Sequence, residues 1–363
     1  MIDFFEIDFI DIESKKSGDA IPLRYCVSGD TYIHVTDGGF QGSGEAVVNH
    51  IRKYYENPRR IDHVVVTHPD GDHAGGLRTV LDEFDVSTLW MLRPWEYTEE
   101  LLPKFPTYTS ADRLRSRLRS IYPNIVALEE LAQEKGIPIA EPFQGAHIGE
   151  FGVLAPSKER YLDLVASSER TPESMAAGRD ESKSQAGGLF AEAARQVVQF
   201  VKAVWGAENF SEEPTSAENE MSVVQYAKLC SKTIMLTGDA GREALTEAAD
   251  YAPNMGLFLP GIDRFQVPHH GSRRNLSTEL ADRLLGKRLT DRPENGGGSF
   301  SAIISAAKED EDHPKKAVVR AMYHRGGAVI TTEGVNIRTS YNAPEREGWT
   351  PVTPVEYPDD QEE

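Results

Sequence analysis

Residues 61–73, Ile-Asp-His-Val-Val-Val-Thr-His-Pro-Asp-Gly-Asp-His, join an apolar run to a cluster of polar side chains. The first part, Ile61–Thr67, is short, β-branched and almost wholly apolar, which predicts a strand buried on both faces. A loop follows, and residues 74–84 then predict a helix. Open α/β folds place their active sites beyond the carboxyl ends of such strands. The polar residues of this loop are therefore the first candidates for a functional site.

The loop carries four ligand-type side chains within six residues: His68, Asp70, Asp72 and His73. Imidazole and carboxylate groups bind Zn²⁺ and Mn²⁺. Because alternate positions just past a strand can aim at one point, and the next residue beside it, the spacing suits two adjacent ions. A polar turn with incidental histidines is the alternative, and four ligand-type residues behind a buried strand make it the weaker one.

Two later segments repeat this pattern of a short strand that ends in ligand-type residues. Thr233–Thr237 is an apolar run followed by Gly238-Asp239, and Val267-Pro268 is followed by His269-His270-Gly271-Ser272. Each motif alone is more often part of a structural turn than of a functional site. Together with the first cluster, they are expected to lie at the same edge of the fold.

The order His-x-Asp-x-Asp-His-x-Gly-Gly, then Gly-Asp, then His-His-Gly-Ser resembles the metallo-β-lactamase-like domain of bacterial DNA-uptake (competence) channel proteins. The resemblance runs from about Phe9 to Gly334, apart from helical insertions. Further matching stretches are Ile10-Asp11-Ile12, Gly18-Asp19, Asn219 with Ser222-Val223-Val224, and His313-Pro314. The resemblance implies a mixed α/β fold, a four-layer αβ/βα sandwich, with metals at one edge of two sheets. Those channel proteins also carry a large membrane domain, which this sequence does not contain, so DNA import is not inferred.

The resemblance also implies two divalent metal ions, Zn or Mn, and a set of ligands for each. One ion would bind Asp72, His73 and His269, and the other would bind His68 and Asp70 with weak help from Asn219 or water. Asp239 would bridge the two ions. Two departures concern the second ion, because Asp70 and Asn219 stand where the wider superfamily usually has histidine. His147 is a weaker alternative ligand. The additional oxygen ligands shift the preference from Zn toward Mn.

These residues predict a metal-dependent hydrolase, in the first place a phosphodiesterase or nuclease that acts on DNA or RNA. A divalent ion lowers the pKa of a bound water to about 7, so that the water attacks at neutral pH. Asp72 would take part at this centre, and His270 or His313 would protonate the leaving group. Residues expected at the substrate are Asn219, Ser272 and Arg273.

Two other functions remain open at this point. The net charge of −19 repels polyanions and favours a small substrate, such as a phosphocholine ester, a cyclic nucleotide or a lactone. The loss of the third histidine, at Asn219, favours a regulatory protein with a vestigial site, for example one component of an antiphage system. The ligand-type residues retained at every other motif argue against this last function.

The organisation expected along the 363 residues is one domain over 1–340, with helical insertions at about 95–140 and 158–218 and a disordered acidic tail at 341–363. The most amphipathic stretch of the second insertion is Ala191–Trp205. The insertions are the expected contact for a homo-oligomer or a partner protein. The arginines at 113, 115, 117 and 119 predict a solvated helix face rather than a phosphate-binding patch.

The amino terminus, Met1–Glu6, has no basic region and no long apolar run, so we expect no signal peptide, no contact with a membrane and a cytoplasmic location. Two cysteines, Cys26 and Cys230, lie far apart in the sequence. They predict neither a disulfide framework nor a cysteine-based zinc site.

Overall fold

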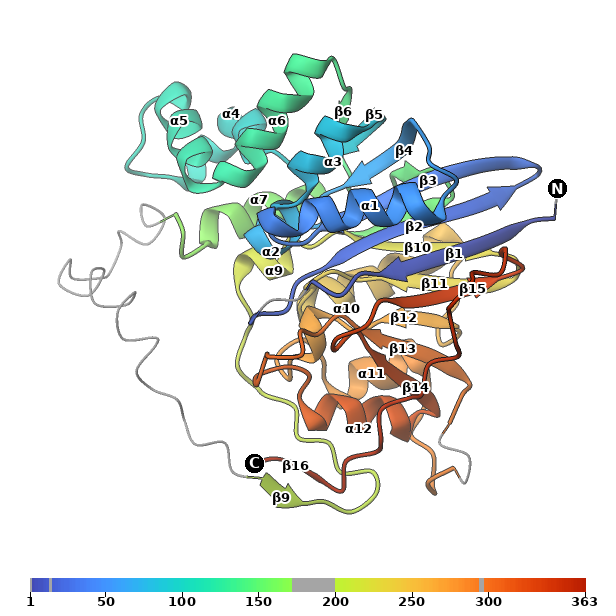
Figure 1. Cartoon of the computed structure of the whole chain (residues 1–363). Helices are drawn as coiled ribbons and strands as arrows, with labels where there is room; N and C mark the ends of the chain where they lie inside the picture. Colours follow the sequence, from blue (N-terminus) through green and yellow to red (C-terminus); the bar gives the residue numbers. More distant parts are fainter. Residues whose placement is uncertain (1, 13–14, 172–199, 294–296) are drawn as a thin grey trace.

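The computed structural model describes residues 2–12, 15–171, 200–293 and 297–363, and its core is two seven-stranded sheets (Figure 1). The first sheet has the order β15-β1-β2-β3-β4-β5-β6, with strands Ile337–Tyr341, Phe4–Phe9, Ala20–Val27, Asp30–Gly38, Arg60–Val65, Asp85–Trp90 and Ile139–Ala140. The second has the order β14-β13-β12-β11-β10-β8-β7, with strands Gly327–Thr331, Phe300–Ile304, Arg264–Gln266, Lys232–Leu236, Val224–Leu229, Phe151–Ala155 and His147–Ile148. A small third sheet pairs β16 (Asp360–Glu362) with β9 (Phe200–Lys202).

Helices lie on the outer faces of both large sheets (Figure 1). The α-helices are α1 Gly44–Tyr54, α2 Gly71–Ala74, α3 Leu77–Glu83, α4 Thr98–Leu101, α5 Ala111–Ile121, α6 Pro123–Lys135, α7 Lys158–Ser167, α9 Ala217–Glu220, α10 Arg242–Tyr251, α11 Thr278–Leu285 and α12 Lys316–His324. Short 3₁₀ turns are η1 Gln41–Ser43, η2 Pro94–Tyr97, η3 Leu102–Lys104, η6 Ala252–Met255 and η7 His269–Gly271.

Three apolar clusters define the layers. The cluster between the sheets joins β1, β2 and β4 to β8, β10 and β11 through buried side chains that include Ile7, Leu23, Phe151 and Ile234. A second cluster packs α1, α3 and α6 on the outer face of the first sheet. A third packs α10, α11 and α12 on the outer face of the second. Both sheets are thus buried on two faces, which gives the order helix, sheet, sheet, helix and confirms the predicted fold class.

Parallel strand pairing brings the polar motifs to one edge. β4 runs parallel to β3 and β5, and the polar loop 68–73 follows its carboxyl end. In the second sheet, β11 and β12 are also parallel, and they end just before Asp239 and His269 respectively. Because the sheets pack face to face, these strand ends meet, as the sequence predicts.

The inserted segments agree only in part with the helices expected. Residues 95–140 carry α4, α5 and α6, and Arg119 of α5 pairs with Glu129 and Glu130 on α6. Residues 158–218 begin with α7 and end within α9. Residues 172–199, with most of the predicted amphipathic helix Ala191–Trp205, lie outside the described residues. Where that stretch is described, residues 200–202 form the strand β9 rather than helix.

The carboxyl-terminal segment 341–363 differs from the predicted disordered tail. Arg346 forms ion pairs with two buried carboxylates of β1, Glu6 and Asp8, at 2.8 and 2.7 Å. Farther along, β16 pairs with β9, and Glu362 accepts bonds from the first residues of α12. The acidic, proline-containing composition suggested disorder, but these ionic and backbone contacts fix the segment to the domain.

No helix in the described parts of the chain is both long enough and apolar enough to cross a membrane. Cys26 and Cys230 are free thiols.

Candidate metal centre

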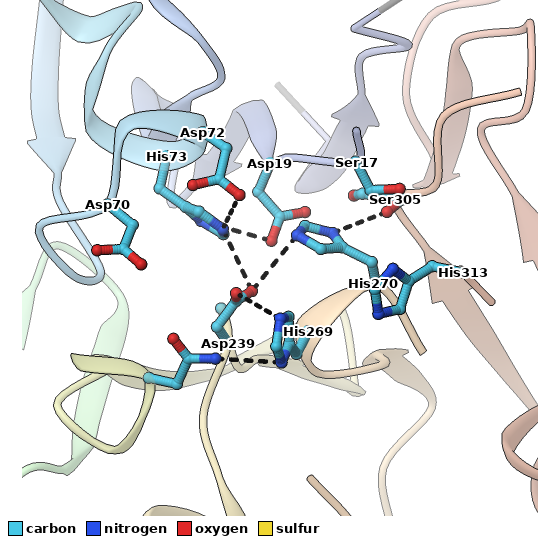
Figure 2. A network of polar contacts seen from close by, with 12 residues as sticks. Ser17, Asp19, Asp70, Asp72, His73, Asp239, His269, His270, Ser305 and His313 are labelled. Carbon is cyan, nitrogen blue, oxygen red and sulfur yellow. Dashed lines mark hydrogen bonds and ion pairs between the residues drawn. The ribbon is translucent and has the colours of Figure 1, made fainter. Parts of the chain in front are cut away.

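Asp239 lies at the centre of a cluster of imidazoles (Figure 2). Its Oδ1 is 3.2 Å from His73 Nε2 and 3.7 Å from His270 Nε2. Its Oδ2 is 3.9 Å from His68 Nε2 and 3.6 Å from His269 Nε2. One carboxylate therefore faces four histidines, which is the position expected of a shared ligand. The three strand-end motifs form a single site.

The protein holds three of these histidines through the other ring nitrogen. The Nδ1 contacts are His73 to Asp37 Oδ2 at 2.8 Å, His270 to the backbone oxygen of Ser305 at 2.8 Å, and His68 to Thr67 Oγ1 at 3.0 Å. Contacts of this kind set the tautomer and the orientation of metal-binding histidines. They leave Nε2 of each ring directed at the cluster.

The free atoms of the cluster fit a divalent cation. Within the described part of the chain, Nε2 of His68, His73 and His270 and Oδ1 of Asp239 are buried without a hydrogen-bond partner. Buried polar atoms of a folded protein are normally satisfied, so such a group needs a ligand. Among the residues that the structure describes, ligand atoms within 4.8 Å of one another define four possible groups: His68-His73-Asp239, Asp72-His73-His270, Asp19-Asp239-His270 and Asp19-Asp37-His73. Nitrogen and oxygen donors in this mixture suit Zn²⁺ or Mn²⁺.

The charges of the cluster also favour a bound cation. Burial opposes ionisation of Asp239, but the nearby imidazoles of His73, His269 and His270 outweigh it and hold its pKa well below the usual range. Burial likewise opposes the charged form of His73, but Asp239 and Asp37 raise its pKa well above normal. Burial raises the pKa of Asp19 to about 7. Protons on His73 and Asp19 thus offset the negative charge of the cluster. A bound divalent ion would take over that neutralising role.

The structure groups His270, rather than the predicted His269, with Asp72 and His73. The His270 side chain is 4% exposed, whereas that of His269 is 26% exposed. His269 Nδ1 lies 3.1 Å from both Asn219 Nδ2 and Asn275 Oδ1. His269 therefore lies at the solvent side of the cluster, with Nε2 toward Asp239.

Backbone conformation explains this difference between neighbouring histidines. His269 and His270 both have positive φ, 47° and 54°, and Gly271 follows at 84°. A non-glycine residue in such a conformation costs about 1–3 kcal/mol, and residues of this kind cluster at functional sites. This left-handed turn gives the His269 and His270 side chains directions that the alternation of a regular strand does not predict.

Two carboxylates of the site were not among the predicted site residues. Asp19 lies 3.7 Å from His73, and its backbone N–H donates to Asp72 O. A Cβ on the preceding residue, Gly18, would lie 2.5 Å from that oxygen, so the turn needs glycine. Asp37 closes the β3 end with φ of 56°. The Gly-Asp pair at 18–19, like that at 238–239, was the available signal.

Asp70 and Asn219 are engaged elsewhere. Asp70 Oδ1 is 2.7 Å from Arg170 Nη1, and its Oδ2 remains 3.9 Å from His68 Nε2. The Asn219 side chain accepts from Ser216 and donates to Thr215, besides its contact with His269.

The remaining predicted residues lie around the cluster. The His313 ring stacks on His269 with a centroid separation of 5.6 Å, and its Nδ1 is 3.2 Å from Asp310. Ser272 Oγ accepts from the backbone N–H of Arg274, and the Arg273 side chain donates to the backbone oxygen of Glu363. His147 lies exposed on the edge strand β7.

Residues 25–147 match the family model of the metallo-β-lactamase superfamily. That stretch covers about a third of the chain and includes the loop 68–73. The two sheets and their helical layers have the arrangement of the metallo-β-lactamase sandwich. A solved structure described as a hydrolase, AbOPH, in the beta lactamase superfamily is 11% identical, with a TM-score of 0.33, and the match covers 66% of this chain and 70% of that one. No curated protein matches this chain. The narrower resemblance to DNA-uptake channel proteins stays a prediction.

Proposed function

We propose that this protein is a metal-dependent phosphodiesterase, in the first place a nuclease that acts on DNA or RNA. The observation that carries the proposal is the carboxylate of Asp239 among four imidazoles, three of which have a buried Nε2 with no hydrogen-bond partner among the described residues. Residues suited to hold an ion form the groups Asp72-His73-His270 and Asp19-Asp239-His270, which share His270. A bound divalent ion would lower the pKa of a water and stabilise the negative charge that develops on the substrate. A mixed oxygen and nitrogen site suits Mn²⁺ as well as Zn²⁺.

The chain's own residues would orient the ligands and move a proton. Asp37 accepts from Nδ1 of His73 and so keeps Nε2 free toward the centre. His313 is the better candidate for the proton donor of the two predicted from the sequence. Both nitrogens of His270 are engaged, one with Ser305 and one within the ligand group. His313 instead is partly exposed, pairs with Asp310 and lies beside His269 at the rim of the cluster.

A small-substrate hydrolase is the second candidate. The net charge of −19 favours it, since a long polyanion is repelled by the average surface. A phosphocholine ester, a cyclic nucleotide or a lactone would each fit this class. A regulatory protein with a vestigial site is disfavoured, because a site that had lost its ion would have no reason to keep three unpartnered imidazole nitrogens buried.

The test is metal analysis combined with hydrolysis assays. The purified protein would be stripped, reloaded with Mn²⁺ or Zn²⁺, and assayed on single-stranded DNA, duplex DNA, RNA, a chromogenic phosphodiester, a phosphocholine ester and a lactone. Asp239→Asn serves as the inactive control. Asp62→Asn, which changes a partly buried residue of β4, serves as the active control. Cleavage of a phosphodiester by wild type and Asp62→Asn alone supports the proposal. Hydrolysis of the lactone alone, or equal rates with Asp239→Asn, would overturn it.

A further inference from the structure

The place expected to hold a second ion has few ligands of its own. Among the described residues, Asp70 belongs to none of the four carboxylate and histidine groups with metal-binding geometry. The Asn219 side chain is occupied by contacts with Ser216, Thr215 and His269. His68 belongs to one of the four groups, together with His73 and the shared Asp239. Within these groups, a second ion would therefore share His73 and Asp239 with the other groups, and His68 alone would belong to it.

A cationic side chain already lies at this place. Arg170 Nη1 is 2.7 Å from Asp70 Oδ1, and Arg170 Nε is 3.8 Å from Glu218. Asp70 Oδ2 lies on the side of His68, 3.9 Å from Nε2. The Asp70 carboxylate thus lies between the Arg170 guanidinium and the His68 imidazole. The ion pair uses the carboxylate that would otherwise bind a metal ion.

We propose that Arg170 replaces the second metal ion, so that the chain binds one divalent ion tightly and uses Arg170 to hold an anionic oxygen of its substrate. A planar guanidinium carries five N–H donors and binds phosphate and carboxylate oxygens in a forked geometry. Asp70 takes one side of this fork. The Arg170 side chain is 43% exposed, so the remaining donors are accessible to a ligand. The substrate role rests on the proposed hydrolase function, whereas the number of ions does not.

The number of ions is tested by titration with Mn²⁺, followed by calorimetry and by elemental analysis of the dialysed protein. Wild type should bind one ion tightly. Arg170→Ala frees Asp70 and should add a second binding event, and Arg170→Ala/Asp70→Asn should lose it again. Arg59→Ala removes an equally charged but exposed side chain, and it should bind as wild type does. Two tight ions in wild type, or one ion in both wild type and Arg170→Ala, would overturn the replacement.

The anion-binding role is tested with inorganic phosphate as the probe. Wild type and Arg170→Ala/Asp70→Asn have the same net charge and the same expected single ion, so their phosphate affinities compare directly. Loss of a charge-assisted contact should weaken phosphate binding by at least about tenfold in the double variant. Arg170→Lys, which keeps the charge and should keep the fold, should weaken it less. Equal phosphate affinity in all three proteins would overturn this role even if hydrolysis is observed. Absence of hydrolysis alone would instead count against the proposed function.

Discussion

Substitution of Asp37 by asparagine should lower the affinity for metal without unfolding the protein. Asp37 Oδ1 accepts from the backbone N–H of Thr67 at 2.9 Å. Its Oδ2 accepts from Thr67 Oγ1 at 2.6 Å and faces His73 Nδ1 at 2.8 Å. In Asp37→Asn, the amide oxygen would keep the backbone contact, and the NH₂ group would then face Nδ1. A donor there favours the tautomer with the proton on Nε2, which blocks ligation.

The size of this effect follows from the contacts that change. A hydrogen bond to a charged group contributes about 1.5–3 kcal/mol. Changes to residues that hold a ligand typically cost about 10- to 100-fold in metal affinity, which is about 1.4–2.8 kcal/mol. We therefore expect the Kd for Mn²⁺ to rise by that factor, and hydrolysis to recover in part at high Mn²⁺ concentration.

Calorimetric titration of stripped protein measures the Kd, and circular dichroism checks the fold. Asp62→Asn is the control, because Asp62 also accepts from a backbone N–H, that of Ile33, but lies away from the cluster. A folded Asp37→Asn protein with the Kd of wild type would refute the reasoning. It would mean that His73 does not bind the ion through Nε2.

Four further outcomes are expected. His270→Ala should weaken Mn²⁺ binding by more than about 100-fold and His269→Ala by less than about tenfold, measured by titration; the reverse order would support His269, the ligand predicted from the sequence. Arg346→Ala should lower the free energy of unfolding in urea by about 3 kcal/mol, because it removes a buried partner of Asp8; an unchanged value would show that the tail is not docked. Hydrogen bonds and ion pairs with His50 and Arg346 hold the pKa of Asp8 below its ordinary 3.8 despite burial. The stability contributed by Asp8 is therefore complete above pH 3.8 and is lost as pH falls through the lower folded pKa. The free energy of urea unfolding should thus depend less on pH in Asp8→Asn than in wild type over that acidic range. Parallel pH profiles for the two proteins would contradict this. Stripped protein should regain hydrolysis better with Mn²⁺ than with Mg²⁺, which dehydrates reluctantly, and equal recovery in a metal titration would show that the site is not of mixed nitrogen and oxygen donors.

The elements that the sequence predicts well are those with a strong local pattern. The β-branched run at 61–67 becomes β4, and most of the helix predicted at 74–84 becomes α3. The elements that it misses are set by distant partners. β15 lies at the edge of the first sheet because it pairs with β1, more than 300 residues earlier. The tail contacts the first sheet because Arg346 pairs with carboxylates of that same strand.

The sequence by itself determined which segments supply the candidate ligands, because apolar strands that end in histidine or aspartate are a local signal. It therefore placed Asp72, His73 and Asp239 at one edge of the fold. Only the tertiary structure groups His270, rather than His269, with Asp72 and His73, since this grouping depends on two left-handed backbone conformations. Only the tertiary structure brought Arg170 to Asp70, a hundred positions apart, because a contact between distant segments depends on how the layers pack. Side-chain chemistry and periodicity are local properties of the chain, whereas the direction and the partner of each ligand are properties of the packed fold.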